Sequence, residues 1–234
     1  MKIGILQCGH APDLPRRNHG DFDDMFARIF TPYDVTFETF NVVDTVFPTG
    51  PEAADAWLLT WSKHGAYEDH AFIKPLEALI RDIHASPQRM VGICFGHQII
   101  AQALGGTVAK FSGGWSIGRT AYDFGPLGEL YLNAWHQDQV LQKPTDAQTI
   151  ASNAFCKHAG LQYGESILTI QPHPEISPAI TADYLIMAQS DPAYPNDLIA
   201  RACDDAHKQT DDAKMADALM VFLRSGAARP AFAP

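Results

Sequence analysis

The chain has 234 residues, 46% of them hydrophobic, and its 27 acidic and 17 basic residues give a formal net charge of −10. This length and composition fit one large α/β domain, or such a domain with a helical appendage, and are sufficient for a substantial core. The acidic balance argues against nucleic acid or an anionic membrane as partner, because both bind clustered positive charge. No segment is apolar for long enough to cross a bilayer, and "MKIGILQCGH" lacks the pattern of a signal peptide.

Residues 2–104 alternate between short apolar runs and amphipathic segments. Four runs predict buried strands: 2–8, 35–40, 56–61 and 89–93. Three segments have apolar residues at helical spacing and predict helices: 22–30, with Asp21 as its cap, 70–86 and 97–104. Strands that alternate with helices predict a parallel sheet with helices on both faces.

The pattern changes twice after residue 106. From 107 to 170, short strand-like pieces separated by glycine, proline and polar turns predict a mostly antiparallel region without a long helix. Residues 177–226 predict helices that begin at Ser177 and at Asn196, with a last one that begins at Thr210 or Asp211 and ends at Gly226. We expect these helices to pack on the α/β body through Leu185, Ile186, Leu198, Ile199, Leu219 and Phe222.

The four cysteines, Cys8, Cys94, Cys156 and Cys203, are far apart and form no Cys-x-x-Cys pair. This spacing favours reduced thiols over a disulfide framework, so we expect a cytoplasmic protein. Cys94 stands out because Gly92 and Gly96 flank it between a predicted strand and a predicted helix. Small residues around a strand–turn–helix are typical of a nucleophile elbow, in which a strained turn exposes the side chain. The amides at the start of the helix also favour the thiolate.

A second signal is "LTIQPHPEI", where His173 and Glu175 directly follow a β-rich run. Functional residues of parallel sheets collect where strands end, so Cys94 and His173 are expected at the same edge. A cysteine nucleophile needs a base, and the base needs an orienting partner. His173 suits the first role and Glu175 the second.

Together, "GICFGHQ" and "QPHPE" resemble the class I glutamine amidotransferase family, over roughly residues 1–180. The stretches "SKHGAYED" and "HQDQV" resemble its stand-alone branch, which includes glutaminase-like proteins, the glutaminase part of guanylate synthase and γ-glutamyl peptidases. With the strand and helix pattern, the resemblance implies an α/β, flavodoxin-like fold. This is an open, mostly parallel sheet flanked by helices, with a small antiparallel sheet and C-terminal helices. We expect a domain over 1–180 and a helical extension over 181–234 that packs on it.

The resemblance implies that Cys94 is the nucleophile, His173 the base and Glu175 its partner. It also implies that Gln98 holds the substrate and that the backbone amides of Phe95 and Ser62 form the oxyanion hole. In the loop that contains Ser62, relatives commonly have glycine, whereas this chain has Trp61 immediately before Ser62.

Other residues leave two interpretations open. Gly114 and Trp115 either bring backbone close to the amino-acid end of a substrate or form an ordinary glycine turn. His136 is more typical of a loop histidine that closes over a pocket than of a second base. No His-Glu-x-x-His cluster, phosphate loop or dinucleotide fingerprint is present, so neither metal nor another cofactor is expected.

The predicted activity is that of a cysteine-nucleophile amidohydrolase, which hydrolyses the side-chain amide of L-glutamine through a γ-glutamyl thioester and releases ammonia. One alternative is a γ-glutamyl peptidase that acts on γ-glutamyl compounds. Another is a glutaminase subunit that delivers ammonia to a separate synthetase subunit. A third is a non-catalytic binding or thiol redox-sensing domain on the same scaffold.

Overall fold

The computed structural model describes residues 1–225, which are built around a seven-stranded sheet. Its strands are β1 (Lys2–Leu6), β2 (Thr36–Phe40), β3 (Ala56–Leu59), β4 (Arg89–Ile93), β9 (Gln148–Ala151), β10 (Gly160–Tyr163) and β11 (Ile167–Ile170). They lie in the order β2-β1-β3-β4-β11-β10-β9. In this spatial order the first five strands, β2 to β11, are parallel, whereas β10 and β9 are antiparallel to their neighbours. The parallel part has the strand order of flavodoxin-like sheets.

The central strands are apolar because both faces of the sheet are covered. Every residue of β3 and β11 is buried, as are the last four residues of β4. Such continuous apolar runs are typical of parallel strands between two helical layers. In contrast, the edge strand β2 has no buried residue and alternates between exposed and half-buried positions.

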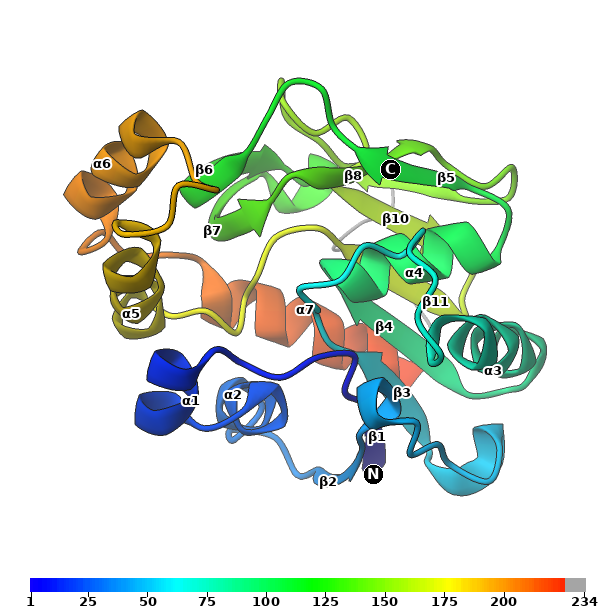
Figure 1. Ribbon diagram of the computed structural model, residues 1–234. Coiled ribbons are helices and arrows are strands. Elements are labelled where there is room, and N and C mark those ends of the chain that lie inside the picture. Colours follow the sequence, from blue (N-terminus) through cyan, green and yellow to red (C-terminus); the bar gives the residue numbers. More distant parts are fainter. Residues whose placement is uncertain (226–234) are drawn as a thin grey trace.

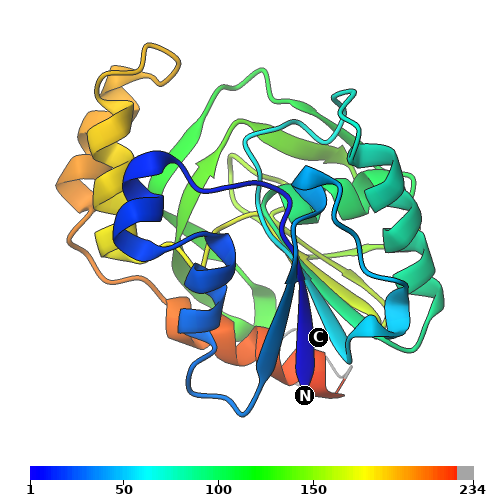
Figure 2. The same cartoon turned by 60° about the horizontal axis from the view of Figure 1, so that its bottom comes forward.

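Helices flank the sheet on both sides (Figures 1 and 2). The helices are α1 (Asp13–His19), α2 (Phe22–Ile29), α3 (Ile73–Ala85), α4 (Phe95–Ala103), α5 (Pro178–Ala188), α6 (Asn196–Asp205) and α7 (Asp212–Ser225). Short 3₁₀ turns lie at Val42–Asp44, Pro51–Ala53 and Gly125–Leu127. Helices α3 and α4 pack on one face, and α7 packs on the other beside α2. None of these helices has both the length and the apolar character to span a membrane.

Of the four predicted helix caps, two are confirmed and one is wrong, while the last helix begins at Asp212, directly after the predicted position Asp211. Asp21 forms a capping box with Asp24 at the start of α2, and the Ser177 hydroxyl accepts the Ile180 amide at the start of α5. Asn196 does not cap α6. It is the first helical residue, and Pro195 precedes it without a side-chain hydrogen bond. Gly226, the predicted end of the last helix, lies outside the described residues.

The region 107–170 has the expected strand-rich, helix-poor character. Strand β5 (Thr107–Lys110) pairs with β8 (Asp138–Gln142), and β6 (Ser116–Asp123) pairs with β7 (Glu129–His136), both antiparallel. These ribbons lie together at the top of Figure 1. The mostly parallel sheet, the small antiparallel sheets and the C-terminal helices confirm the predicted fold class.

Four of the six side chains expected to anchor the C-terminal helices are buried. Leu185, Ile199, Leu219 and Phe222 are at most 3% exposed, whereas Leu198 is half-buried. Ile186 is 59% exposed, so its predicted packing role is wrong: it points away from the surface that Leu185 covers. Helix α7 contacts β4 in the centre of the sheet. The division into residues 1–180 and 181–234 stays a prediction.

Two neighbouring residues of α7 allow a direct test of this packing. Phe222→Ala should lower the free energy of unfolding by about 3–5 kcal/mol, because it leaves a cavity under a helix that covers the sheet. The matched control Val221→Ala changes a residue that is 45% exposed, so its effect should stay within about 0.5 kcal/mol. Urea unfolding followed by circular dichroism measures both. Equal effects would show that α7 is not anchored through Phe222.

Candidate functional site

Cys94 has a backbone conformation that ordinary residues avoid. It lies between β4 and α4 with φ 51° and ψ −102°. Among the non-glycine residues of 1–225, only Cys94 and Thr45 have positive φ. This conformation is costly for a residue with a Cβ and persists only where the surroundings impose it. The predicted elbow geometry at Cys94 is therefore confirmed.

The two flanking glycines are needed because the chain packs closely there. A Cβ on Gly96 would lie 2.5 Å from the carbonyl oxygen of Leu59 in β3. A Cβ on Gly92 would lie 2.7 Å from the carbonyl oxygen of Gly96. Without side chains, the first turn of α4 can rest directly on β3 and β4, which fixes the position of Cys94.

Three parallel strands bring the other candidate residues to the same edge. Leu59 at the end of β3 pairs with Gly92 of β4, and Ile170 at the end of β11 pairs with Ile93. The Cys94 amide donates to the carbonyl of Ile170 (2.9 Å). The segments that follow β3, β4 and β11 therefore meet at the carboxyl edge of the sheet, where α/β proteins bind ligands.

The backbone of His173 is held by the antiparallel ribbon rather than by the main sheet. Its amide donates to the carbonyl of Asn133 in β7 (2.9 Å), and the Asn133 side chain donates to the carbonyl of Ile176 (2.7 Å). Asn133 thus clamps both sides of the His173–Glu175 turn. It was missed in the sequence, where its only signal is one amide side chain inside the apolar run "LYLNAW".

His173 and Glu175 form a completely buried pair. Nδ1 of His173 lies 2.8 Å from Oε1 of Glu175, and both side chains have no exposed surface. Burial alone would lower the pKa of His173. The negative charges of Cys94 and Glu175 outweigh it and raise that pKa to about 10. The other ring nitrogen, Nε2, makes no hydrogen bond of normal length and angle to any of residues 1–225.

The Cys94 sulfur also belongs to a buried amide relay. Nε2 of Gln171 donates to Sγ of Cys94 (3.4 Å), and Nε2 of Gln98 donates to Oε1 of Gln171 (3.1 Å). The same Gln98 nitrogen donates to the carbonyl of Asp138 (2.9 Å). Gln98 lines the cavity beside Cys94, but its amide nitrogen is already engaged. Gln171 was missed as a site residue, although it stands two positions before His173.

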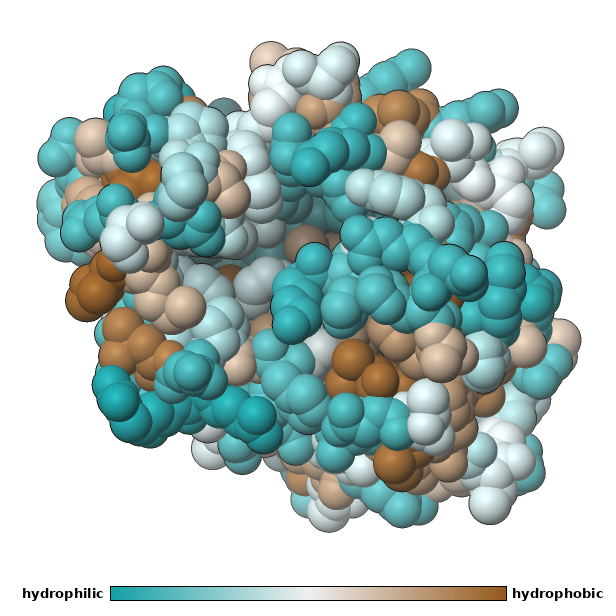
Figure 3. Space-filling view, in the orientation of Figure 1, coloured by the Kyte–Doolittle hydropathy of each residue, from teal (hydrophilic) through white to brown (hydrophobic). Residues whose placement is uncertain are grey.

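Cys94 opens into a cavity of about 350 Å³, seen as the hollow at the centre of the face in Figure 3. Five aromatic side chains form one wall of this cavity: Trp61, Trp115, Trp135, Tyr184 and Tyr194. The centroids of neighbouring rings are 4.9–5.6 Å apart, which is the spacing of favourable aromatic pairs. We name this set the aromatic wall. Of its members, only Trp115 was singled out in the sequence as a site residue.

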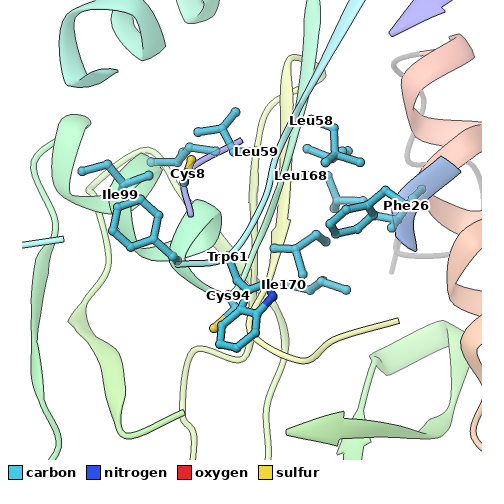
Figure 4. Packing of buried hydrophobic residues seen from close by; sticks show 14 of the residues in the cluster. Cys8, Phe26, Leu58, Leu59, Trp61, Cys94, Ile99, Leu168 and Ile170 are labelled. Carbon is cyan, nitrogen blue, oxygen red and sulfur yellow. The ribbon is translucent and has the colours of Figure 1, made fainter. Parts of the chain in front are cut away.

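Trp61 is the part of the aromatic wall nearest to the candidate catalytic residues. Figure 4 shows its ring beside Cys94. The Trp61 ring stands edge-on to the His173 ring, with centroids 5.2 Å apart, and also packs on Phe22 at 4.8 Å. Trp61 does not have a positive φ, so the loop does not require a glycine-like backbone conformation at this position. A tryptophan at this position, where the family resemblance led us to expect glycine, is therefore compatible with the backbone geometry.

Both backbone segments expected to donate to an oxyanion flank the cavity. Phe95 is the first residue of α4, and amides of the first helical turn have no acceptor within the helix. Ser62 lines the cavity, and its hydroxyl accepts the amide of His64 (3.2 Å). Gly114, in contrast, is not among the lining residues. It forms a turn with φ 91°, and its amide donates to Phe111.

His136 lines the cavity as a buried, neutral ring. Burial, together with the nearby charge of His173, lowers the pKa of His136 to about 3. Its Nδ1 lies 3.2 Å from the carbonyl of Asp138, so in the neutral ring Nδ1 donates and Nε2 accepts. Nε2 has no partner within residues 1–225. Charged residues of both signs also line the cavity: Lys63, Lys110, Glu68, Asp138 and Asp191.

Comparisons with known proteins show which family this chain is similar to. The family model described as "Glutamine amidotransferase class-I" matches residues 64–188. Gamma-glutamyl peptidase 4 of Arabidopsis thaliana is 27% identical over 188 residues, covering 74% of this chain and 75% of the relative. A glutamine-hydrolyzing GMP synthase subunit of Saccharolobus solfataricus is 34% identical over 95 residues, or 37% of this chain and 50% of that protein.

Among solved structures, a glutamine amido transferase from Methylobacillus flagellatus matches with a TM-score of 0.72 and 19% identity. The match covers 97% of this chain and 94% of that chain, so the likeness in fold extends over nearly the whole molecule. The family model spans more than half of the sequence and includes Cys94, His173 and Glu175. The chain belongs to the class I glutamine amidotransferase family and is a cysteine-dependent amidohydrolase.

Proposed function

We propose that the protein hydrolyses the side-chain amide of glutamine, with Cys94 as nucleophile, His173 as acid and base, and Glu175 as the group that orients His173. One observation carries the proposal. A cysteine held at positive φ beside a cavity interacts electrostatically with a buried histidine–carboxylate pair whose Nδ1 and Oε1 atoms are 2.8 Å apart. Glu175 accepts from Nδ1, which leaves Nε2 for proton transfer at the reacting atoms.

In the first half-reaction, the Cys94 thiolate attacks the amide carbon, and the π electrons of the carbonyl bond move to its oxygen. The amides of Phe95 and Ser62 donate to this oxyanion. His173 gives its proton to the leaving nitrogen, so that ammonia departs and a γ-glutamyl thioester remains. The raised pKa of His173 keeps the imidazolium charged beside the thiolate before attack.

In the second half-reaction, His173 takes a proton from water and the hydroxide attacks the thioester carbonyl. The carbon–sulfur bond breaks, glutamate leaves and the thiolate is restored. Gln171 donates to the sulfur of the free cysteine in this structure, so we assign it to orienting the thiolate before attack and after its release. Gln98 donates a hydrogen bond to Gln171 and so holds it in place. Because Gln98 also lines the cavity, we propose that it contacts the substrate.

The cavity offers partners for the amino-acid end of the substrate. The α-amino group of glutamine is positive and its α-carboxylate is negative, and the lining includes two lysines and three acidic residues. Trp115 lines the cavity and can contact the substrate. Gly114 does not line it, so its role is to form the turn that precedes Trp115. Neither of these assignments requires a metal or another cofactor.

A second candidate substrate is a γ-glutamyl peptide, in which an amine other than ammonia leaves. The aromatic wall favours it, because free glutamine has no group beyond its amide that could cover the partly exposed rings of Trp115 and Tyr194. Gamma-glutamyl peptidase 4 of Arabidopsis thaliana is one of the relatives matched over most of this chain. The two activities share the same thioester, so the wall decides between leaving groups and not between mechanisms.

The remaining interpretations have less support. Delivery of ammonia to a separate synthetase subunit draws on a match to only 37% of this chain. A non-catalytic thiol sensor would not require the orienting contact between His173 and Glu175. We also propose a cytoplasmic location, because the four cysteines are free in the structure.

The first test of this function is labelling with an electrophilic glutamine analogue, read by peptide mass spectrometry. Cys94 should be labelled and excess glutamine should protect it. Burial raises the pKa of Cys156 to about 12 and also raises that of Cys8, so both should stay unlabelled. Cys94→Ser should abolish labelling, whereas the control Cys203→Ser should leave it unchanged. Labelling spread equally over the cysteines would contradict the proposal.

The second test is the pH dependence of Cys94 alkylation. The folded pKa of His173 is raised, so its positive charge is present through the neutral range and is lost as pH rises through about 10. His173→Gln removes this charge. Iodoacetamide should therefore alkylate the variant more slowly by about a hundredfold near pH 6.5, where only about one hundredth of an unassisted thiol is thiolate, and the difference should shrink towards pH 10. A constant ratio across this range would exclude charge stabilisation by His173.

The third test distinguishes the two substrates. Trp115→Ala should lower kcat/KM for a γ-glutamyl peptide with an aromatic leaving group by about fivefold, since one ring contact is worth about 1 kcal/mol. Glutamine turnover should change much less. Phe111→Ala is a matched control, because this nearby ring packs on Phe155 and is not among the cavity-lining residues. Equal losses with both substrates would remove the argument for peptides.

A further inference from the structure

Three side chains of the loop between β3 and α3 come together at the cavity. Nδ1 of His64 lies 3.7 Å from Oε2 of Glu68, and Nε2 of His70 lies 2.7 Å from the same oxygen. One ligand atom from each residue falls within 4.8 Å of the others. The spacing His-x-x-x-Glu-x-His does not match a His-Glu-x-x-His motif, which is why the sequence predicts no metal site.

We propose that His64, Glu68 and His70 bind a divalent transition-metal ion, with Zn²⁺ as the best fit. Two imidazoles and a carboxylate are a common zinc ligand set that leaves a fourth position open. Tetrahedral bonds of about 2.0–2.2 Å separate ligand atoms by about 3.4 Å. The two nitrogen–oxygen separations of 3.7 and 2.7 Å lie on either side of this spacing, and the three ligand atoms are all within 4.8 Å of one another. The ion takes the place of the proton that His70 shares with Glu68.

The ligands are already oriented by packing. The rings of His64 and His70 lie 4.0 Å apart, and each packs on Phe72, with centroids 5.9 and 6.0 Å from it. Phe72 is itself buried and packs on Phe95. Lys63 is the neighbouring positive charge that opposes a cation, and the carboxylate of Glu68 offsets it. The site thus has ordered donors before any ion arrives.

The position of this cluster connects it to the cavity. His64 and Glu68 line the cavity, and the His64 amide donates to the hydroxyl of Ser62. An ion that links residues 64, 68 and 70 cross-links the loop that carries the Ser62 amide. Metal binding should therefore stiffen the loop at the cavity mouth, independently of which amide the enzyme hydrolyses.

The test uses tag-free, EDTA-stripped protein carrying Cys94→Ser, so that the Cys94 thiol cannot bind the metal. Titration calorimetry with Zn²⁺ should show one site and a raised Tm. His64→Gln and His70→Gln should each weaken binding at least tenfold. His84→Gln, which changes an exposed histidine on α3, is the matched control and should bind as tightly as the parent.

Co²⁺ added to the protein with Cys94 intact gives an independent readout. We expect visible d–d absorption without a thiolate-to-cobalt charge-transfer band. Three results would overturn the proposal: no Zn²⁺ binding at millimolar concentration, full binding by the doubly substituted His64→Gln/His70→Gln protein, or a Co²⁺ spectrum that shows thiolate ligation and disappears with Cys94→Ser.

Discussion

The structure depends on the close packing of α4 against β3 and β4, which forces Cys94 into a positive-φ conformation. The contact is possible only because Gly92 and Gly96 present bare backbone, with the position of a Cβ on Gly96 2.5 Å from a carbonyl oxygen of β3. The strain at Cys94 is small compared with the burial of the surrounding strands and helix. Stability of the core therefore maintains Cys94 in its position at the cavity.

The remaining groups of the candidate site come from segments with different supports. His173 and Glu175 follow β11, but Asn133 of the β6–β7 ribbon holds their turn. Gln171 reaches the sulfur from the end of β11, and Gln98 of α4 donates to Gln171. The aromatic wall combines residues from the loop after β3, the ribbon, α5 and the segment after it. The main sheet thus positions the chemistry, and the later elements shape what can enter.

Much of this arrangement is predictable from the sequence, because local patterns carry it. The strand at 89–93, the elbow at Cys94 and the meeting of Cys94 with His173 follow from apolar runs, glycine spacing and the parallel order of strands. The Gln98–Gln171–Cys94 relay and the role of Asn133 do not, because they join residues 40 or more positions apart that have no shared pattern. Ile186 shows a different limit: an apolar residue near a helical stripe need not face the core.

The two ends of the cavity differ in how freely they can evolve. At the floor, any side chain at Gly92 or Gly96 would collide with backbone, so single substitutions there displace Cys94. At the mouth, the partly exposed rings of Trp115 and Tyr194 contact mainly each other and other members of the aromatic wall. Selection can therefore exchange these rings one at a time. A lineage built on this scaffold can acquire new leaving groups while it inherits the same reaction unchanged.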